Sequence, residues 1–360
     1  MKKIGILTFH RAINYGAQLQ AYALQRTVTD LGAECELVDY ICPAITKPYR
    51  PIYITKDKPL MSLAKSLIMF NRRAQKAKSF ESFQDKIVKS KTQYFPEDIQ
   101  NAKDKYDVFI TGSDQVFSPW CADFDPAYFL TFADDKQKYA YAASFATKEI
   151  PDDKKAEFTK RLSGFQKISV REQDNVRLVD ELCKKEAVVT LDPTILLSAE
   201  KWSEIAECDI NEPYVFVYSV MPQISLVEFA CKLAKEKNMK VVFVNDAPHL
   251  PNKNIEYKRA VSVERFVGYI KNASYVVSNS FHATAFSAIF HKSMFIEFQN
   301  KVNRNVRSEG FLASLGISRG IENGVAQETE IDWNDVDIKL NSHREKSLDF
   351  LREIINTEQN

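Results

Sequence analysis

Short apolar runs alternate with longer amphipathic runs along most of this chain, and that alternation constrains the fold more than any other feature. The first apolar run, Ile4–Phe9, has the length of a strand. The next run, Gln18–Leu31, places its apolar residues on one helical face and is followed by Gly32, a common helix stop. Cys35–Tyr40 is again strand-like. This order predicts an α/β fold with a parallel sheet covered by helices.

The chain is long enough for two such sheets, because its 360 residues exceed the usual size of a single core. We expect a first Rossmann-like domain over 1–165, with a basic helical insertion at about 41–105, and a second over 166–335. A last helix within 336–360 is expected to cross back to the first domain. Ligands of open parallel sheets bind beyond the carboxyl ends of the strands, so we expect two domains facing a central cleft.

Charge and cysteine content argue against several classes of protein. A net charge of +1 gives no overall basic field, so we expect no nucleic-acid partner. The six cysteines form no CxxC pair, which argues against a zinc site or a disulfide framework and fits a reducing compartment. The N-terminus shows no signal peptide, and no apolar run reaches the roughly 18 residues of a membrane span. We expect a cytoplasmic protein that needs no metal.

Two loops after predicted strands of the first half carry polar side chains. The loop 8–18 opens a predicted helix, whose N-terminal N–H groups attract an anion or a carbonyl. The loop 111–117 offers side chains that hydrogen-bond sugar hydroxyls or cap a helix, and both roles stay open. The predicted acceptor-binding residues are His10, Asn14, Tyr15, Gly16, Ser113, Asp114 and Gln115.

Two residues of the later strand ends are the predicted catalytic pair. Arg171 follows the strand-like run 168–170, and its planar fork suits a phosphate or carboxylate, with a salt bridge to Glu172 or Asp174 as the alternative. His282 starts a predicted helix after the strand 275–278 and can both give and take a proton near neutral pH. A structural or solvated histidine is the alternative there.

A basic loop follows the last predicted strand, 294–298. Its cations Lys301, Arg304 and Arg307 could hold a phosphate, and a solvated charge run is nearly as good an interpretation. The fingerprints GxGxxG and GxxxxGK[ST] do not occur at the strand ends, which weighs against an NAD enzyme and a P-loop kinase.

Several short segments together match one family in their order and spacing. They are Asn14–Ala17, Leu19–Leu24, Gly112–Gln115, Tyr141–Phe145, Ser169–Glu172, Leu191–Thr194 and Ser280–His282. Through these segments the sequence resembles the polysaccharide pyruvyl transferase family over nearly the whole chain.

The resemblance implies a fold similar to glycosyltransferase type B, phosphoenolpyruvate as the donor, a sugar ketal of a cell-surface polysaccharide as the product, and no cofactor. It also implies that Arg171 and His282 serve donor binding and proton transfer. Many members carry arginine where this chain has Ser280, so Lys301, Arg304 or Arg307 is expected to supply the missing charge. The predicted donor-binding residues are Arg171, Asn279, Ser280, Phe281, Lys301, Arg304 and Arg307.

Two other functions stay open. A glycosyltransferase with a nucleotide-sugar donor would share the fold and could use Glu297 near the ribose, and a non-catalytic partner in polysaccharide assembly is the second alternative. The basic segment 60–91 mixes cations with apolar residues, which indicates either a helix packed on the first domain or peripheral contact with the inner face of the plasma membrane. Membrane contact would suit a lipid-linked oligosaccharide as acceptor.

Overall fold

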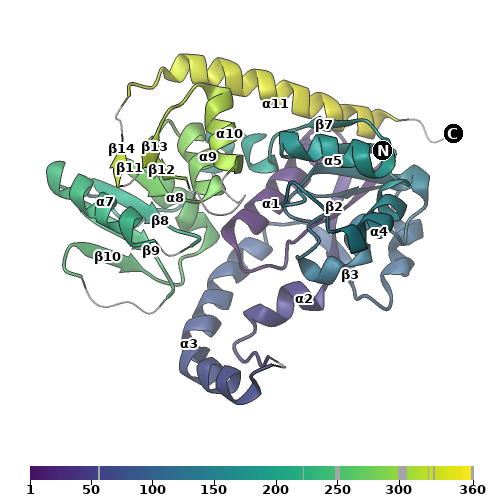
Figure 1. Cartoon of the computed structure of the whole chain (residues 1–360), viewed down its shortest axis with the longest axis horizontal. Helices are drawn as coiled ribbons and strands as arrows, with labels where there is room; N and C mark the ends of the chain where they lie inside the picture. The colour runs from purple at the N-terminus through teal and green to yellow at the C-terminus, as the bar shows by residue number, and fades with distance from the viewer. Residues whose placement is uncertain are drawn as a thin grey trace. The chain divides into compact units, whose positions relative to one another are not determined.

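The computed structural model describes residues 1–55, 57–221, 223–247, 252–298, 306–322, 324–326 and 329–357. The chain divides into two compact units. The first unit comprises Met1–Arg73, Gln84–Leu196 and His343–Asn360, and the second comprises Ala74–Phe83 and Leu197–Ser342. Each unit is built around its own sheet (Figure 1).

The strands are β1 (Lys3–Leu7), β2 (Glu34–Tyr40), β3 (Lys89–Tyr94), β4 (Val108–Thr111), β5 (Lys138–Ala143), β6 (Lys167–Val170), β7 (Ala187–Val189), β8 (Tyr214–Tyr218), β9 (Lys240–Val244), β10 (Ile255–Lys258), β11 (Tyr275–Ser278), β12 (Ser293–Glu297), β13 (Gly320–Glu322) and β14 (Val325–Ala326). The α-helices are α1 (Tyr15–Asp30), α2 (Pro43–Thr46), α3 (Pro59–Gln84), α4 (Asp152–Leu162), α5 (Gln173–Cys183), α6 (Ala199–Ser203), α7 (Ile224–Glu236), α8 (Val263–Asn272), α9 (Phe281–Ile289), α10 (Val306–Leu315) and α11 (Trp333–Asn356).

The first sheet has the order β3-β2-β1-β4-β5-β6-β7, and all its strand pairs are parallel. Its central strands are covered on both faces, since all six residues of β5 are buried. Strands β2 and β3 are added on one side of β1, and strands β4 to β7 are added on the other side. The strand order therefore reverses between β1 and β4, where Leu7 is the partner of Thr111. The loops that leave these two strands therefore share the topological switch point, where open α/β sheets bind ligands.

The second sheet has the order β10-β9-β8-β11-β12-β13-β14 and is parallel except for its last pair, β13 and β14. Its switch point lies between β8 and β11, where Tyr218 is the partner of Ser278. The α/β prediction with two Rossmann-like sheets is therefore confirmed.

The structure changes two of the predicted boundaries. Strands β6 and β7 belong to the first sheet, so the segment 166–196 is part of the first unit and not of a second domain that begins at 166. The first sheet also resumes at β3, within the segment that we assigned to the insertion 41–105. Strand β3 is an edge strand with the polar sequence KSKTQY, so it lacks the apolar run that marks a strand.

The last helix begins at Trp333, a few residues before the predicted start of the terminal segment at 336. Its residues from His343 onward belong to the first unit. Within that unit, Arg344 donates from Nε to the carbonyl oxygen of Ile195 (2.9 Å), and the amide of Leu191 donates to the Ser347 hydroxyl (3.0 Å). The C-terminal half of α11 thus fixes the chain after β7.

Candidate active site

The loop after β1 is held by a buried charged cluster in the first unit. His10 is fully buried; its Nε2 lies 3.2 Å from Asp39 Oδ1, and its Nδ1 lies 3.1 Å from the Thr8 carbonyl oxygen. Arg11 binds both oxygens of Asp39, with Nε at 2.7 Å from Oδ1. Burial alone would raise the pKa of Asp39, but the hydrogen bonds from His10 and Arg11 and the charge of Arg11 lower that pKa far below the ordinary carboxyl range.

This arrangement gives His10 a positioning role, because both of its ring nitrogens are bonded inside the unit and none of its surface is exposed. The direct acceptor contact that we predicted for His10 is revised accordingly. Asn14 caps α1, since its Oδ1 accepts from the Ala17 amide (3.1 Å), and Asn14 itself is exposed. Tyr15 and Gly16 are buried in the first turn of α1. Of these four residues, Asn14 is therefore the one that a ligand can reach.

The loop after β4 makes a tight turn that admits no side chain at Gly112. The φ of Gly112 is 115°, and a Cβ there would lie 2.2 Å from the Tyr141 carbonyl oxygen. Ser113 is fully buried and donates to the Ala142 carbonyl oxygen (2.8 Å), so it also holds the turn. Asp114 follows with a φ of 73° and a side chain that is 18% exposed. The turn thus brings the Asp114 carboxylate to the sheet edge, and the Gln115 amide donates to it (2.9 Å).

Arg171, at the end of β6, lies among three carboxylates. Its Nη1 donates to Asp192 Oδ2 (2.7 Å), its Nε donates to Glu172 Oε1 (3.3 Å), and its Nη2 lies 4.0 Å from Asp114 Oδ1. The Arg171 side chain is only 3% exposed, and burial alone would lower its pKa, but these carboxylates raise it above the ordinary value. The predicted residues Asp114 and Arg171 are therefore brought together, and the guanidinium stays charged.

The ion pair with Glu172 is the alternative that the sequence analysis gave for Arg171, whereas Asp192 is a site residue to which the sequence analysis gave no role. Asp192 is 1% exposed, and its Oδ1 also accepts from the amide (3.0 Å) and the hydroxyl (2.7 Å) of Thr194. Glu172 Oε1 accepts from the Ser144 hydroxyl at the end of β5 (3.0 Å). The motif Leu191–Thr194 was the signal for Asp192, since it belongs to the segments that carry the family resemblance.

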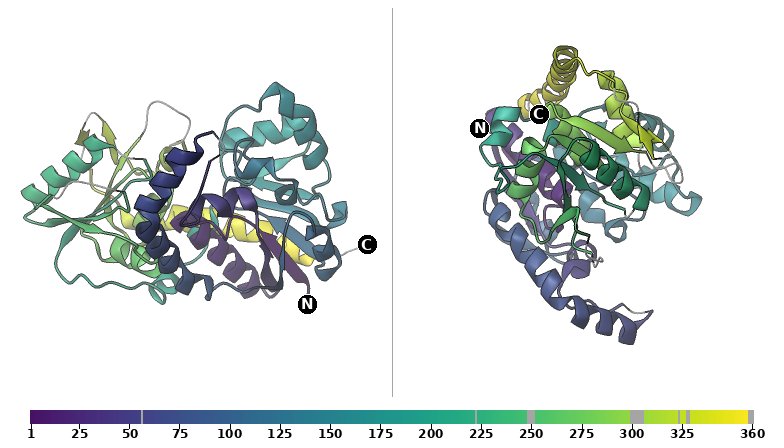
Figure 2. Two further views of the ribbon diagram at one scale, coloured as in Figure 1. Left: turned by 90° about the horizontal axis from the view of Figure 1, so that it is seen from below. Right: turned by 90° about the vertical axis from the view of Figure 1, so that its left-hand side faces the viewer.

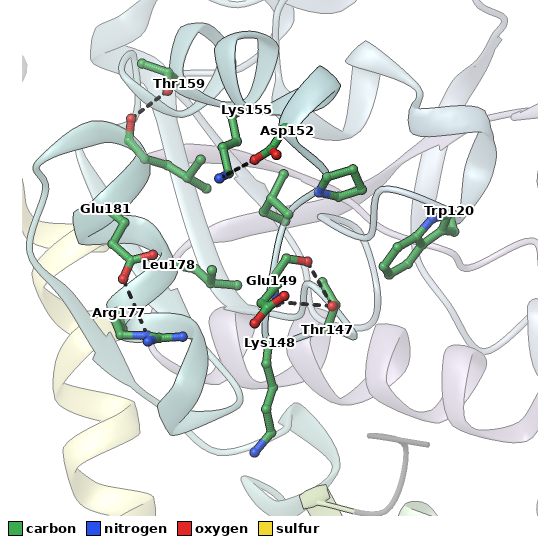
Figure 3. Close-up of a pocket in the computed structure, with 13 residues that line it drawn as sticks. Trp120, Thr147, Lys148, Glu149, Asp152, Lys155, Thr159, Arg177, Leu178 and Glu181 are labelled. Carbon is green, nitrogen blue, oxygen red and sulfur yellow. Dashed lines mark hydrogen bonds and ion pairs between the residues drawn. The ribbon is translucent and has the colours of Figure 1, made fainter. Parts of the chain in front are cut away.

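A pocket of about 740 Å³ lies in the first unit among the segments that follow β4 and β5 and the helices α4 and α5 (Figure 3). Trp120 at its rim is 64% exposed. The pocket's cations are each paired with a carboxylate: Lys155 with Asp152 (2.6 Å), Arg177 with Glu181 (3.5 Å) and Lys148 with Asp174 (2.8 Å). Because these charges are balanced, the pocket suits a neutral polar ligand better than an anionic one.

In the second unit, buried polar side chains fix the turn between β11 and α9. Asn279 is 2% exposed; its Oδ1 accepts from the Val220 amide (2.9 Å), and its Nδ2 donates to the Met221 carbonyl oxygen (3.0 Å). Asn279 thus joins the ends of β8 and β11 at the switch point. Ser280 is the N-cap of α9, because its Oγ accepts from the Ala283 amide (3.5 Å). Both residues therefore shape the turn, and the direct donor contact that we predicted for them is revised to positioning.

His282 is the second residue of α9 and is partly exposed. Its ring meets Phe281 edge-on, with centroids 5.3 Å apart, and Phe281 in turn packs against Phe311 of α10 (5.9 Å). The guanidinium carbon of Arg307 lies 5.9 Å from the Phe281 ring centre. One predicted cation, Arg307, is thus near the start of α9, whereas Lys301 and Arg304 lie outside the described residues.

Glu297, the candidate ribose ligand of the alternative function, ends β12. It is 8% exposed, and its Oε1 accepts from the Ser225 hydroxyl (2.6 Å). Across the described ranges, with their gaps, no group of three or more His, Cys, Asp or Glu side chains could hold a metal ion.

Comparison with solved structures finds folds that are similar to the fold of this chain. UDP-GlcNAc 2-epimerase from Neisseria meningitidis is 11% identical over 99% of this chain and 95% of its own, with a TM-score of 0.51. The UDP-GlcNAc 2-epimerase from Methanocaldococcus jannaschii is 10% identical over 100% of this chain and 94% of its own, with a TM-score of 0.48. The Escherichia coli heptosyltransferase WaaC is 12% identical over 83% of this chain and 89% of its own, with a TM-score of 0.40. No curated protein matches the chain in sequence.

The two α/β sheets and the match to the Neisseria meningitidis epimerase define a fold of the glycosyltransferase type B class. Within that class, the family model of polysaccharide pyruvyl transferases matches residues 14–296. The matched range takes in Asp114, Arg171, Asp192 and His282. The chain belongs to the polysaccharide pyruvyl transferase family, and it is a transferase.

Proposed function

We propose that the protein transfers the pyruvyl group of phosphoenolpyruvate onto two hydroxyls of one sugar in a cell-surface polysaccharide and releases phosphate. The observation that carries this proposal is a family match that spans both units and includes a partly exposed histidine at a helix start. Phosphoenolpyruvate is an anion whose methylene carbon must be protonated before the sugar oxygen can add to it. A histidine beside the positive end of a helix offers both the proton and an attraction for the anion.

In this proposal His282 protonates C3 of the donor. Electron density moves from the C2–C3 double bond to the new C–H bond, and the first sugar hydroxyl bonds to C2 as it loses its proton. The second hydroxyl then bonds to C2 while the C2–O bond to phosphate breaks, and its proton leaves with the phosphate. The product is a ketal that carries a methyl and a carboxylate group, and no electrons are gained or lost.

The donor's negative charges need fixed cations. Arg307 of α10, near Phe281, is the described candidate beside α9, and we propose that Lys301 and Arg304, which precede it in the sequence, contribute. They would replace the arginine that many members carry at the position of Ser280.

For Arg171 we propose a role in donor binding. Its guanidinium lies at the end of β6, where Asp192 holds Nη1 at 2.7 Å and Asp114 lies 4.0 Å from Nη2. Arg171→Lys is expected to weaken phosphoenolpyruvate binding, and unchanged donor affinity in that variant would assign Arg171 a structural role.

The acceptor sugar is proposed to bind to the first unit, at Asp114, Gln115 and Asn14. Carboxylate and amide oxygens accept hydrogen bonds from sugar hydroxyls, and we propose that the partly exposed Asp114 carboxylate takes the proton that the attacking hydroxyl loses. Further sugars of an oligosaccharide would occupy the pocket beside Trp120, whose exposed indole offers a flat apolar surface. Trp120→Ala is then expected to raise KM for an oligosaccharide acceptor and leave KM for a simple glycoside unchanged.

Thermal unfolding with different donors separates this proposal from a nucleotide-sugar glycosyltransferase. Phosphoenolpyruvate is expected to raise Tm in a concentration-dependent way, and UDP and GDP sugars are not. In the alternative, a nucleotide sugar raises Tm and Glu297→Ala removes that shift. The hydrogen bond between Glu297 and Ser225 already occupies one of its oxygens, which favours phosphoenolpyruvate.

A further inference from the structure

The N-terminal half of α3 exposes aliphatic side chains on one face. Leu60 is 83% exposed, Leu67 60% and Ile68 81%, and Met61 beside them is 61% exposed. Leu60, Leu67 and Ile68 follow the i, i+7, i+8 spacing of a continuous helical stripe. In a helix of a water-soluble domain, such a stripe normally faces the core. We call Leu60, Met61, Leu67 and Ile68 the apolar face of α3.

The covered side of the same helix is polar. The segment 50–55 runs along it, held by hydroxyl groups: Ser66 accepts from the Tyr53 amide (3.1 Å) and donates to the Tyr53 carbonyl oxygen (2.8 Å). The Ser62 hydroxyl accepts from the Thr55 amide (3.0 Å), and Ser66 is only 1% exposed. Ser66 is thus the most buried side chain in this half of α3, Leu63 and Met69 are half-buried, and the aliphatic side chains of the apolar face point outward. This reverses the usual pattern of a helix that packs on a core.

Cations flank the apolar face. Lys65 is exposed within α3, two residues before Leu67, and the exposed Lys58 directly precedes the helix. From Lys58 to Phe80 the sequence contains no Asp or Glu. The surroundings of the apolar face are thus positively charged, and they complement a negatively charged surface. Figure 2 shows this half of α3 standing away from the first sheet.

We infer that the apolar face of α3 inserts into the surface of an anionic phospholipid membrane, with the exposed Lys58 and Lys65 at the lipid head groups. Aliphatic side chains beside lysine and arginine are the pattern of helices that lie in a membrane interface. A second copy of the chain fits less well, because two such faces would bring like charges together. The inference does not depend on which donor the protein uses.

No helix in the described part of the chain is long and apolar enough to cross a membrane.

Vesicle flotation with the full chain tests the inference. The wild-type protein is expected to float with vesicles of phosphatidylcholine and phosphatidylglycerol, to stay behind with pure phosphatidylcholine, and to be released by high salt. Leu67→Ser/Ile68→Ser is expected to lower the bound fraction at least several-fold. Lys58→Gln/Lys65→Gln is expected to lower the salt concentration at which the protein leaves the vesicles. Ile68→Phe, which keeps an apolar side chain, is expected to bind like the wild type.

Matched controls use other exposed residues. Ile338 of α11 is 70% exposed, so Ile338→Ser removes a comparable aliphatic side chain, and Lys160→Gln removes an exposed charge of α4; both are expected to leave flotation unchanged. Unchanged Tm values would show that the variants fold. If the wild type does not float with anionic vesicles, or if Leu67→Ser/Ile68→Ser floats equally well, the inference is wrong. A dimer that dissociates in Leu67→Ser/Ile68→Ser would likewise overturn it and assign the face to a second copy.

Discussion

Arg171 and Asp192 form a buried ion pair in the first unit, with Nη1 of the arginine 2.7 Å from Oδ2 of the aspartate and side chains that are 3% and 0% exposed. The pair joins the end of β6 to the segment after β7. Because Asp192 holds one edge of the guanidinium, the other edge keeps a fixed direction beside Asp114. Asp192 is therefore a positioning residue for Arg171.

We predict that Asp192→Ala destabilises the protein by about 3–5 kcal/mol, because it leaves the buried Arg171 charge without its closest partner. Chemical unfolding of the variant and the wild type measures the difference. Asp152→Ala is the control, since Asp152 forms its ion pair with Lys155 on the surface and its loss should leave unfolding unchanged. Equal unfolding curves for wild type and Asp192→Ala would contradict the assigned role.

We predict that His282→Ala lowers kcat by about 10²–10⁴-fold and leaves the free energy of unfolding nearly unchanged, because His282 is partly exposed and supplies a proton. Phosphate release measures turnover. His291→Ala is the matched control: His291 is also partly exposed, and its Nε2 pairs with Asp337 at 2.9 Å. Full activity in His282→Ala would favour a non-catalytic role for the chain.

The stability of the first unit is expected to depend on the ionisation of Asp39. The pKa of Asp39 is lowered in the folded state, so its contribution to stability is complete above the ordinary carboxyl pKa of about 3.9 and is lost as the pH falls below that value. This contribution is measured as the difference in the free energy of unfolding between wild type and Asp39→Asn at a series of pH values. The wild type should be the more stable at pH 7, and this difference should become smaller below about pH 4. A difference that is independent of pH would show that the charge of Asp39 does not stabilise the fold.

Gly112→Ala is predicted to lower both stability and turnover more than a typical substitution on the surface does. Its Cβ would lie 2.2 Å from the Tyr141 carbonyl oxygen at a positive φ, so the turn that carries Asp114 must move, at a cost of more than about 1–3 kcal/mol. Gly310→Ala in α10 is the matched control, because nothing lies within 4 Å of its Cβ and alanine favours a helix by about 0.5–1 kcal/mol. Unfolding and turnover of both variants provide the comparison. A Gly112→Ala variant with wild-type activity would show that the turn does not position the site.

The α/β fold could be predicted from sequence because most of its strands are short apolar runs with buried side chains. Strand β3 could not, since an edge strand with a polar sequence carries no apolar signal. The end of the first domain was misplaced because a strand's sequence does not state which sheet it joins, and β6 and β7 pair with β5 and with each other.

Site residues could be predicted where they directly follow a strand, because ligands of parallel sheets bind beyond the carboxyl ends of the strands. Asp114 and Arg171 were found in that way, and they lie within an ion-pair distance. Their environment was not predictable, because Asp192 and Ser144 reach the site only through tertiary packing. The burial of His10 and Asn279 likewise depends on partners distant in sequence, Asp39 and Val220. Local sequence cannot distinguish such positioning residues from residues that contact a ligand.

Mass spectrometry of the transfer reaction in deuterium oxide tests pyruvyl transfer most directly. The protein is incubated with phosphoenolpyruvate, UDP and GDP sugars and a panel of glycosides, and phosphate is measured in the same samples. We predict a glycoside that gains a pyruvyl group with one solvent deuterium in its methyl, an equal amount of released phosphate, and neither product with His282→Ala. Intact phosphoenolpyruvate together with a glycoside that gains a sugar from UDP or GDP sugars would contradict the account.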